Sequence, residues 1–311
     1  MNPSQAASSE RRLVERSLET LEEWCRKIAC GDEEIETIHQ ARVGSRRFRA
    51  ALGLFGSVLG ESTARELRRM SRNLGRALGL VRDADVFLRH LVRLRPLGDP
   101  ARAAALRFAR NRVRLEREDD LSPMRAEVAR FLEASALLPR ELHSARAGRP
   151  ERGAPVPGSM REAIGALLKE LIGLEEELLA GGDLAAAHRM RIAAKHLRYA
   201  MEMVRGAFPS AKGKTFDAGL SLASNVQGML GHVQDHHVWN GRLKQMRREV
   251  KRLLQDHVLA AALGRLAGAE RRGRGRKLRQ FLRKWGSERA AEDGTLAALS
   301  AQLGPGGRPE G

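Results

Sequence analysis

The chain has 311 residues, of which 42% are hydrophobic and only 4% aromatic. This content excludes an unfolded chain, and a core built from Leu, Ala, Val and Met favours an all-α fold over a β-sandwich. A net charge of +18, with 47 arginines among the 56 basic residues, points to a polyanion or an anionic surface as the partner.

Residues 1–9 are polar, and we expect them to form a disordered tail. They lack the apolar segment of a signal peptide, and no run elsewhere is long enough to span a bilayer. We therefore expect a cytoplasmic protein without membrane contact. An amphipathic helix follows and ends at Gly31. Its two cysteines, Cys25 and Cys30, lie about 140° apart round the helix axis, so they cannot easily share a disulfide or a metal.

The next helix carries the most informative stretch, which begins after a candidate N-cap at Asp32. From Ile38 to Phe55 it reads I-H-Q-A-R-V-G-S-R-R-F-R-A-A-L-G-L-F. At about 100° per residue, its apolar residues form one stripe. Cations fill the adjoining arc at His39, Arg42, Arg46 and Arg49. A basic arc beside a core stripe points along a groove between packed helices, which indicates an anion site.

A third helix is expected from Ser62 to about Leu80, with a second basic row at Arg65, Arg68, Arg72 and Arg76. This row could extend the groove, or it could be an ordinary exposed face. Arg47, Arg72 and Arg76 are therefore second-rank candidates. The motif V-R-D-A-D-V-F follows from Val81, and its Asp83 is either a positioning partner for a groove arginine or a helix cap. Further helices run to about Leu138, with breaks near 96–100 and near 122–123.

Residues 139–159 are rich in Pro, Gly and charge, which marks a linker between an N-terminal bundle at 10–138 and a C-terminal bundle at 160–302. In the second bundle we expect helices at 160–180, 183–206, 215–232, 235–263 with a possible break, and 276–302. We expect residues 303–311 to form a second disordered tail.

The second bundle repeats the first signature. Ala187 to Val204 reads A-H-R-M-R-I-A-A-K-H-L-R-Y-A-M-E-M-V, with cations in step at His188, Arg191, Lys195 and Arg198. V-Q-D-H-H-V-W from Val233 matches V-R-D-A-D-V-F, which places Asp235 opposite Asp83. Two matches in the same order predict an internal duplication.

An arginine-rich helix face is most often a solvated surface. Such a face normally mixes glutamates with the cations, because like charges four residues apart destabilise a helix. No acid occurs between Thr37 and Gly60 or between Leu184 and Met201. This absence and the repeated pattern favour an anion site.

The patterns H-x-x-R-V-x-x-R-R-x-R-A-A-L and H-x-x-R-I-x-x-K-x-L-R-Y resemble the paired signatures of the CHAD family, the conserved-histidine α-helical domains. The resemblance covers roughly residues 10–302. It implies two pseudo-symmetric helical bundles whose basic central surface binds inorganic polyphosphate, without catalysis of its own. His196 stands where the first copy has Arg47, so the site is expected to be asymmetric.

Three other motifs carry weaker signals. His232 and His236 share a helix face beside Asp235 and His237, but no third metal ligand is placed by spacing, so we predict no metal. The run R-R-G-R-G-R-K at 271–277 lacks aromatic residues for base stacking and is interpreted as a flexible basic connection. The E-x-E-x-K motif of the triphosphate tunnel enzymes, often fused to this family, is absent.

The sequence thus predicts a non-enzymatic protein without a cofactor that binds inorganic polyphosphate in a basic groove formed by the paired His/Arg/Lys helices of the two repeats. It could associate with polyphosphate granules. General binding of RNA or DNA backbones is the main alternative, although no recognition helix or RNA-binding signature is present. A metal-dependent phosphohydrolase is the third, but it would need carboxylate ligands in the groove.

Overall fold

The computed structural model describes all residues except 1–2, 138–155, 182, 209–210, 212 and 304–311. Within this part the chain is all-α, without a strand, as the composition predicts. Its elements are α1 (Pro3–Ala29), α2 (Ile35–Phe55), the 3-10 turn η1 (Gly56–Leu59), α3 (Glu61–Arg93), α4 (Pro100–Ala136), α5 (Gly158–Gly181), α6 (Leu184–Ala207), α7 (Lys214–Glu249), the π-helical turn η4 (Val250–Leu254) and α8 (His257–Leu303).

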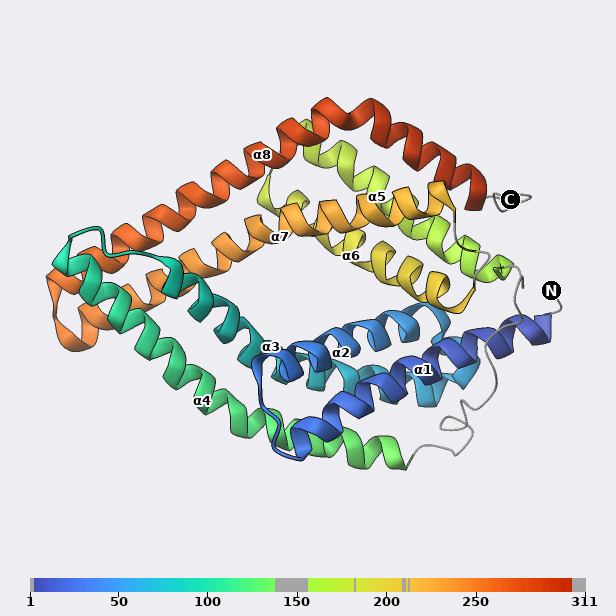
Figure 1. The fold of residues 1–311 in the computed structure, drawn as a ribbon, viewed down its shortest axis with the longest axis horizontal. Helices are drawn as coiled ribbons and strands as arrows, with labels where there is room; N and C mark the ends of the chain where they lie inside the picture. Colours follow the sequence, from blue (N-terminus) through green and yellow to red (C-terminus); the bar gives the residue numbers. More distant parts are fainter. Residues whose placement is uncertain (1–2, 138–155, 182, 209–210, 212, 304–311) are drawn as a thin grey trace.

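Helices α1–α4 form one side of the molecule and α5–α8 the other, with α2 and α6 facing each other near the middle (Figure 1). The long pairs α3–α4 and α7–α8 run away from this centre and meet at a common tip. The two signature helices therefore lie side by side, although 149 residues separate their first histidines.

The hydrophobic core draws on both halves of the chain. Around α2 and α6, a large cluster includes Phe48 and Leu52 from one half and Leu197 and Met201 from the other, each at most 1% exposed. A second cluster at the tip combines α3, α4, α7 and α8, with Phe87 fully buried. Burial stabilises by about 1.5–3 kcal/mol for each such side chain. Most of the predicted linker lies outside the described residues, and the two-domain division and the duplication stay predictions.

Several predicted helix ends are wrong, because packing carries the helices past local breakers. Residues 3–9 belong to α1, α3 continues to Arg93, and α4 runs through Pro123, whose neighbour Met124 is fully buried. Helix α7 has no break near residue 233. It gives way to η4, and the turn comes at Gln255, which has a left-handed φ of 52°.

The basic run 271–277 is not a flexible connection but part of α8. Gly273 in this run is buried, and a Cβ there would lie 2.7 Å from the His236 ring on α7. The glycine thus lets α8 approach α7 closely, and packing between the two long helices outweighs its low helix propensity. A glycine-rich sequence is therefore ordered by its neighbour.

The aspartates that precede the two signature helices, Asp32 and Asp183, differ in whether they cap the helix. Asp183 caps α6, since its Oδ1 accepts a hydrogen bond from the Ala186 backbone nitrogen at 2.6 Å. At α2 the N-cap is Glu34, which makes no side-chain cap bond, so the prediction for Asp32 is wrong. Asp32 still accepts from the Glu34 backbone nitrogen at 3.2 Å and from Thr37 Oγ1 at 2.8 Å, which fixes the entry into the helix.

Candidate anion-binding site

Helices α2 and α6 bring cations from the two halves of the chain into one cluster. The pKa of Lys195 shows that these cations lie close together. Burial is the first cause that lowers it to about 8, and the next are the charges of Arg191, Arg46, Arg49 and Arg42. We call the following six residues the α2–α6 cation cluster: Arg42, Arg46, Arg49, Arg191, Lys195 and Arg198. The sequence predicts all six, and the structure brings them together.

The arginines of this cluster are partly withdrawn from water. Burial is the main reason why the pKa of Arg46 lies below its usual value, and Arg42 and Arg198 lower it further. Burial also lowers the pKa of Arg191, with Arg46 acting in the same direction. Charges that lose hydration need a counter-charge or acceptors in its place. A bound anion would therefore supply the counter-charge that these partly buried cations lack.

Helix α3 positions the α2 arginines through two glycines one turn apart. A Cβ at Gly79 would lie 2.7 Å from Arg42 Nη1, and a Cβ at Gly75 would lie 3.7 Å from Arg49 Nη1. Arg42 Nη2 also lies 3.1 Å from Asp83 Oδ1. Since α3 continues through Asp83, this carboxylate is a positioning partner for an arginine and not a cap.

A similar but weaker arrangement supports Arg191 on the other side. Gly231 of α7 would place a Cβ 3.7 Å from Arg191 Nε. Burial raises the pKa of Asp235, while Arg191 lowers it, so the carboxylate lies within electrostatic reach of this guanidinium. Asp83 and Asp235 thus each interact with an arginine at the corresponding position of a signature helix, Arg42 and Arg191.

Buried polar atoms without a hydrogen-bond partner gather at this place in the described structure. About 90% or more of buried polar groups in proteins are hydrogen-bonded, and an unsatisfied one costs about 1–3 kcal/mol. Here the unsatisfied atoms come from three helices: His39 Nδ1, Arg42 Nη1, Arg46 Nε, Arg82 Nη1, Arg191 Nε, Arg198 Nε and the Tyr199 hydroxyl. Such a concentration of donors is suited to a ligand rich in acceptor oxygens.

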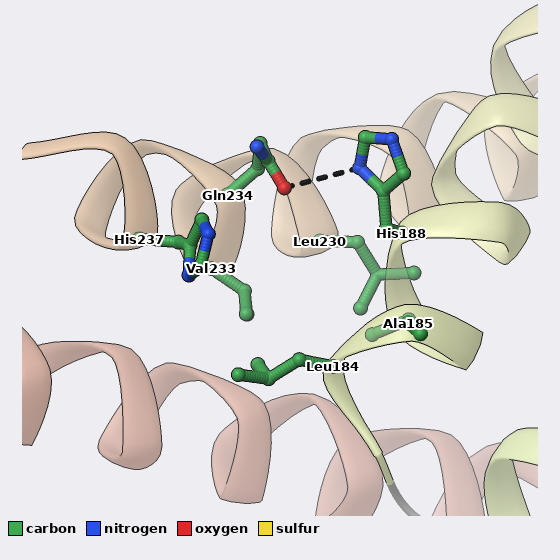
Figure 2. Close-up of a pocket in the computed structure, with 8 residues that line it drawn as sticks. Leu184, Ala185, His188, Leu230, Val233, Gln234 and His237 are labelled. Atoms are coloured by element: carbon green, nitrogen blue, oxygen red, sulfur yellow. Dashed lines mark hydrogen bonds between the residues drawn. The ribbon is translucent and has the colours of Figure 1, made fainter. Parts of the chain in front are cut away.

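The two signature histidines differ. His39 lies near the cluster, since burial, then Arg82, and to a smaller extent Arg46 and Arg42, lower its pKa. His188 instead lies against α7, where its Nδ1 is 3.1 Å from Gln234 Oε1 (Figure 2). It lines a pocket of about 380 Å³ with an apolar wall that includes Leu184 and Val233.

The second-rank candidates, Arg47, Arg72 and Arg76, differ in how they lie relative to the cluster. Arg72 lies near Arg49, whose pKa is lowered by burial and then by Arg72. Arg47 pairs with Glu202 at 3.2 Å, and the same carboxylate lies 3.5 Å from Arg198 Nε, so Glu202 joins Arg47 to the edge of the cluster. Arg76 is exposed on α3. The other members of its predicted row, Arg65 and Arg68, are engaged by Glu61 and by the Leu52 carbonyl.

Two residues at the site were missed by the sequence reasoning. Arg82 on α3 has a buried Nη1 and lowers the pKa of His39, while burial first, and to a smaller extent Arg46, lower the pKa of Arg82 itself. Its signal was present, because it directly precedes Asp83 in the repeated motif. Tyr199 is 1% exposed, and the Arg198 guanidinium lies 4.8 Å from its ring centroid. Tyr199 falls outside the apolar stripe of its helix, so periodicity gave no signal.

The histidines considered as metal ligands have other partners. His236 Nδ1 lies 2.6 Å from Glu270 Oε2, and His90 Nε2 lies 2.8 Å from Glu270 Oε1. His237 Nδ1 accepts from Arg274 Nη1 at 3.1 Å. No group of three metal-ligating side chains suited to an ion occurs within the described ranges. In the same ranges, no helix has the length and apolarity needed to cross a membrane.

The fold and this cluster define a class of all-α protein in which two central helices present matched cationic faces to each other. A profile of the CHAD domain matches residues 12–244, and the chain belongs to the CHAD domain family. No curated protein matches the chain.

Two solved structures share its fold. The CHAD domain from the plant Ricinus communis has 24% sequence identity and a TM-score of 0.58, covering 96% of this chain and 91% of that one. PptA from Streptomyces chartreusis has 18% identity and a TM-score of 0.64, covering 90% and 99%.

Proposed function

We propose that this protein binds inorganic polyphosphate at the α2–α6 cation cluster and does so without catalysing a reaction. The observation that carries the proposal is the set of buried polar atoms without a hydrogen bond that α2, α3 and α6 contribute, of which Arg198 Nε has an ion-pair contact to Glu202 at 3.5 Å. The association of the CHAD family with polyphosphate supports the same ligand.

The spacing of the cations suits a repeating anion better than a single phosphate. Arg42, Arg46 and Arg49 follow one another at intervals of about one turn, and one turn of helix rises about 5.4 Å. Arg191, Lys195 and Arg198 repeat this spacing on the opposing helix. Two rows of cations can accept successive phosphates of a chain, and arginine supplies paired hydrogen bonds to each phosphate it contacts.

The cluster offers little to a nucleobase. Tyr199 lies beside the cluster, but its ring is buried under the Arg198 guanidinium, so it does not provide a free stacking surface. The cluster also contains no Asn or Gln side chain for the edges of bases. Phosphate without an attached base is therefore the better fit to these residues.

Competition binding tests this function. Labelled long-chain polyphosphate is bound first and is then challenged with single-stranded RNA, duplex DNA and short phosphates at matched charge. We expect RNA and DNA to displace it poorly. Arg46→Gln and Arg191→Gln should each weaken binding by about tenfold or more, since a hydrogen bond to a charged group contributes about 1.5–3 kcal/mol.

A matched control is the pair Arg69→Gln and Arg130→Gln, because these exposed arginines pair with glutamates on their own helices. Equal losses in the cluster and control variants would reduce binding to general charge. RNA that competes as well as polyphosphate would contradict the choice of ligand. Turnover of polyphosphate by the purified protein would contradict the non-enzymatic role.

A further inference from the structure

A second cationic pocket lies at the tip, far along the long helices from the α2–α6 cluster. It has a volume of about 810 Å³ and is formed by the α3–α4 connection, the start of α4, the end of α7 and the first half of α8. Four arginines line it, together with one carboxylate, Asp99: Arg102, Arg247, Arg265 and Arg272. The pocket therefore carries an excess of positive charge.

Glycines line this pocket next to its arginines, as glycines of α3 lie next to arginines of the central cluster. Gly264 and Gly268 lie one turn apart on α8, and a Cβ at Gly264 would meet three atoms of Arg247 at 3.4 Å. A Cβ at Gly268 would lie 3.5 Å from Arg272 Nη1. Arg247 reaches Gly264 from α7, as Arg42 reaches Gly79 from α2, whereas Arg272 lies one turn from Gly268 on the same helix.

The single carboxylate leaves most of this charge uncompensated. Asp99 accepts hydrogen bonds from the backbone nitrogens of Ala101 and Arg102, at 2.9 and 3.1 Å, and lies 3.5 Å from Arg265. For Arg247 and Arg272, the described part of the chain provides no carboxylate partner. Two guanidinium groups are thus available to an anion that enters the pocket.

The frame behind the pocket is firmly packed. The tip core fills the space between α3, α4, α7 and α8. Asn240 donates a hydrogen bond of 2.6 Å to the Ala267 carbonyl, and Glu270 on α8 joins His90 of α3 to His236 of α7. A pocket fixed by such contacts is formed before its ligand arrives, which reduces the entropic cost of binding.

We propose that the tip pocket is a second anion site, which binds an inorganic oligophosphate or one segment of a longer phosphate chain. No aromatic, Asn or Gln side chain lines it, so bare phosphate fits better than a nucleotide. Arg247, Arg265 and Arg272 follow the segment matched by the family profile, so this site is a feature of the C-terminal helices. The choice of phosphate as ligand rests on the proposed function, whereas the site rests on the pocket itself.

Isothermal titration with tripolyphosphate at fixed ionic strength tests the inference. The tip variant is Arg247→Gln with Arg272→Gln, the central variant is Arg46→Gln with Arg191→Gln, and the control is Arg69→Gln with Arg130→Gln. All three remove the same charge, and thermal unfolding checks that each is folded. We expect two sites in the wild type and the control, and one site in the tip and central variants.

The outcomes separate the two ideas. One site that survives in the tip variant and is lost in the central variant overturns the tip site and leaves the proposed function standing. If tripolyphosphate binding is lost in the tip variant and unchanged in the central variant, the tip site is supported and the proposed central site is overturned. No binding of tripolyphosphate to the wild type overturns both. Dependence on Arg247 and Arg272 seen with single-stranded RNA but not with tripolyphosphate also overturns the phosphate site.

Discussion

Lys195 should make polyphosphate binding fall as the pH rises above about 8. Burial and the four surrounding arginines lower the pKa of this lysine to about 8 in the free protein, so it loses its charge while the arginines keep theirs. A bound anion favours the charged lysine and raises its pKa again. Binding is therefore coupled to uptake of a proton at high pH, and it is strongest below pH 8.

The size of the effect follows from this coupling. If a bound anion returns the pKa of Lys195 to about 10.4, the ordinary value for lysine, affinity should fall by roughly tenfold between pH 7 and pH 9. In the free protein, burial first and then neighbouring cations lower the pKa of both His39 and His196, so among these three groups Lys195 is the one that loses its charge near pH 8. One group thus accounts for the predicted slope.

The assay is the affinity for polyphosphate measured from pH 6.5 to 9.5 at constant ionic strength. Lys195→Arg is the matched variant, because it keeps the charge throughout this range and should give a nearly flat profile. Lys195→Gln should bind more weakly at pH 7 and also lack the slope. Titration of the ligand itself affects all three proteins equally. Identical profiles for the wild type and Lys195→Arg would refute the reasoning.

Three further predictions concern other parts of the structure. Gly79→Ala should displace Arg42, whose Nη1 would lie 2.7 Å from the new Cβ, and should weaken binding about as much as Arg42→Gln in the same assay. Glu270→Gln should lower the free energy of unfolding by about 1.5–3 kcal/mol in urea, because a neutral amide weakens the buried hydrogen bonds that join this side chain to His90 and His236. Burial alone would raise the pKa of Glu270, but hydrogen bonds from His236 and His90 bring it to about 2, so this stability is present at neutral pH and is lost only as the pH falls from about 4.5 through 2; loss at pH 6 would contradict it. If the six cations of the cluster contact phosphates, the logarithm of affinity should fall with the logarithm of salt concentration at a slope near −4, and a slope near −1 would contradict a shared site.

Helical periodicity was enough to identify the cationic faces, because residues one turn apart share a face whatever the helix packs against. It placed Arg42, Arg46 and Arg49 on one face and Arg191, Lys195 and Arg198 on another. The repeated motif singled out Asp83 but left open whether it was a partner of an arginine or a helix cap. The structure adds that these two faces meet. That meeting depends on contacts between distant helices, which no single helix encodes.

The misses share this origin. Tyr199 is buried because α6 packs against α2 as well as α5 and α7, so a residue outside its main apolar stripe is also covered. His188 and His39 differ for the same reason, since α7 offers Gln234 as a hydrogen-bond partner to His188, whereas α3 has Arg82 beside His39. Residues 271–277 are helical because α8 packs closely against α7, where Gly273 lies next to the His236 ring. In each case the neighbour across the interface decided the outcome.

The central cluster also explains why the two halves need to share cores. Like charges at one-turn spacing destabilise each signature helix, and bringing the two rows together adds repulsion and loss of hydration. The same helices bury Phe48 and Leu52 on α2 and Leu197 and Met201 on α6, so packing on one side offsets the electrostatic cost on the other. The joint core at the tip fixes α3 and α7, which carry Asp83 and Asp235 to the arginines. A bound anion would reduce this repulsion and would therefore stabilise the contact between α2 and α6. Anion binding and the free energy of unfolding of the junction between the halves should thus be coupled.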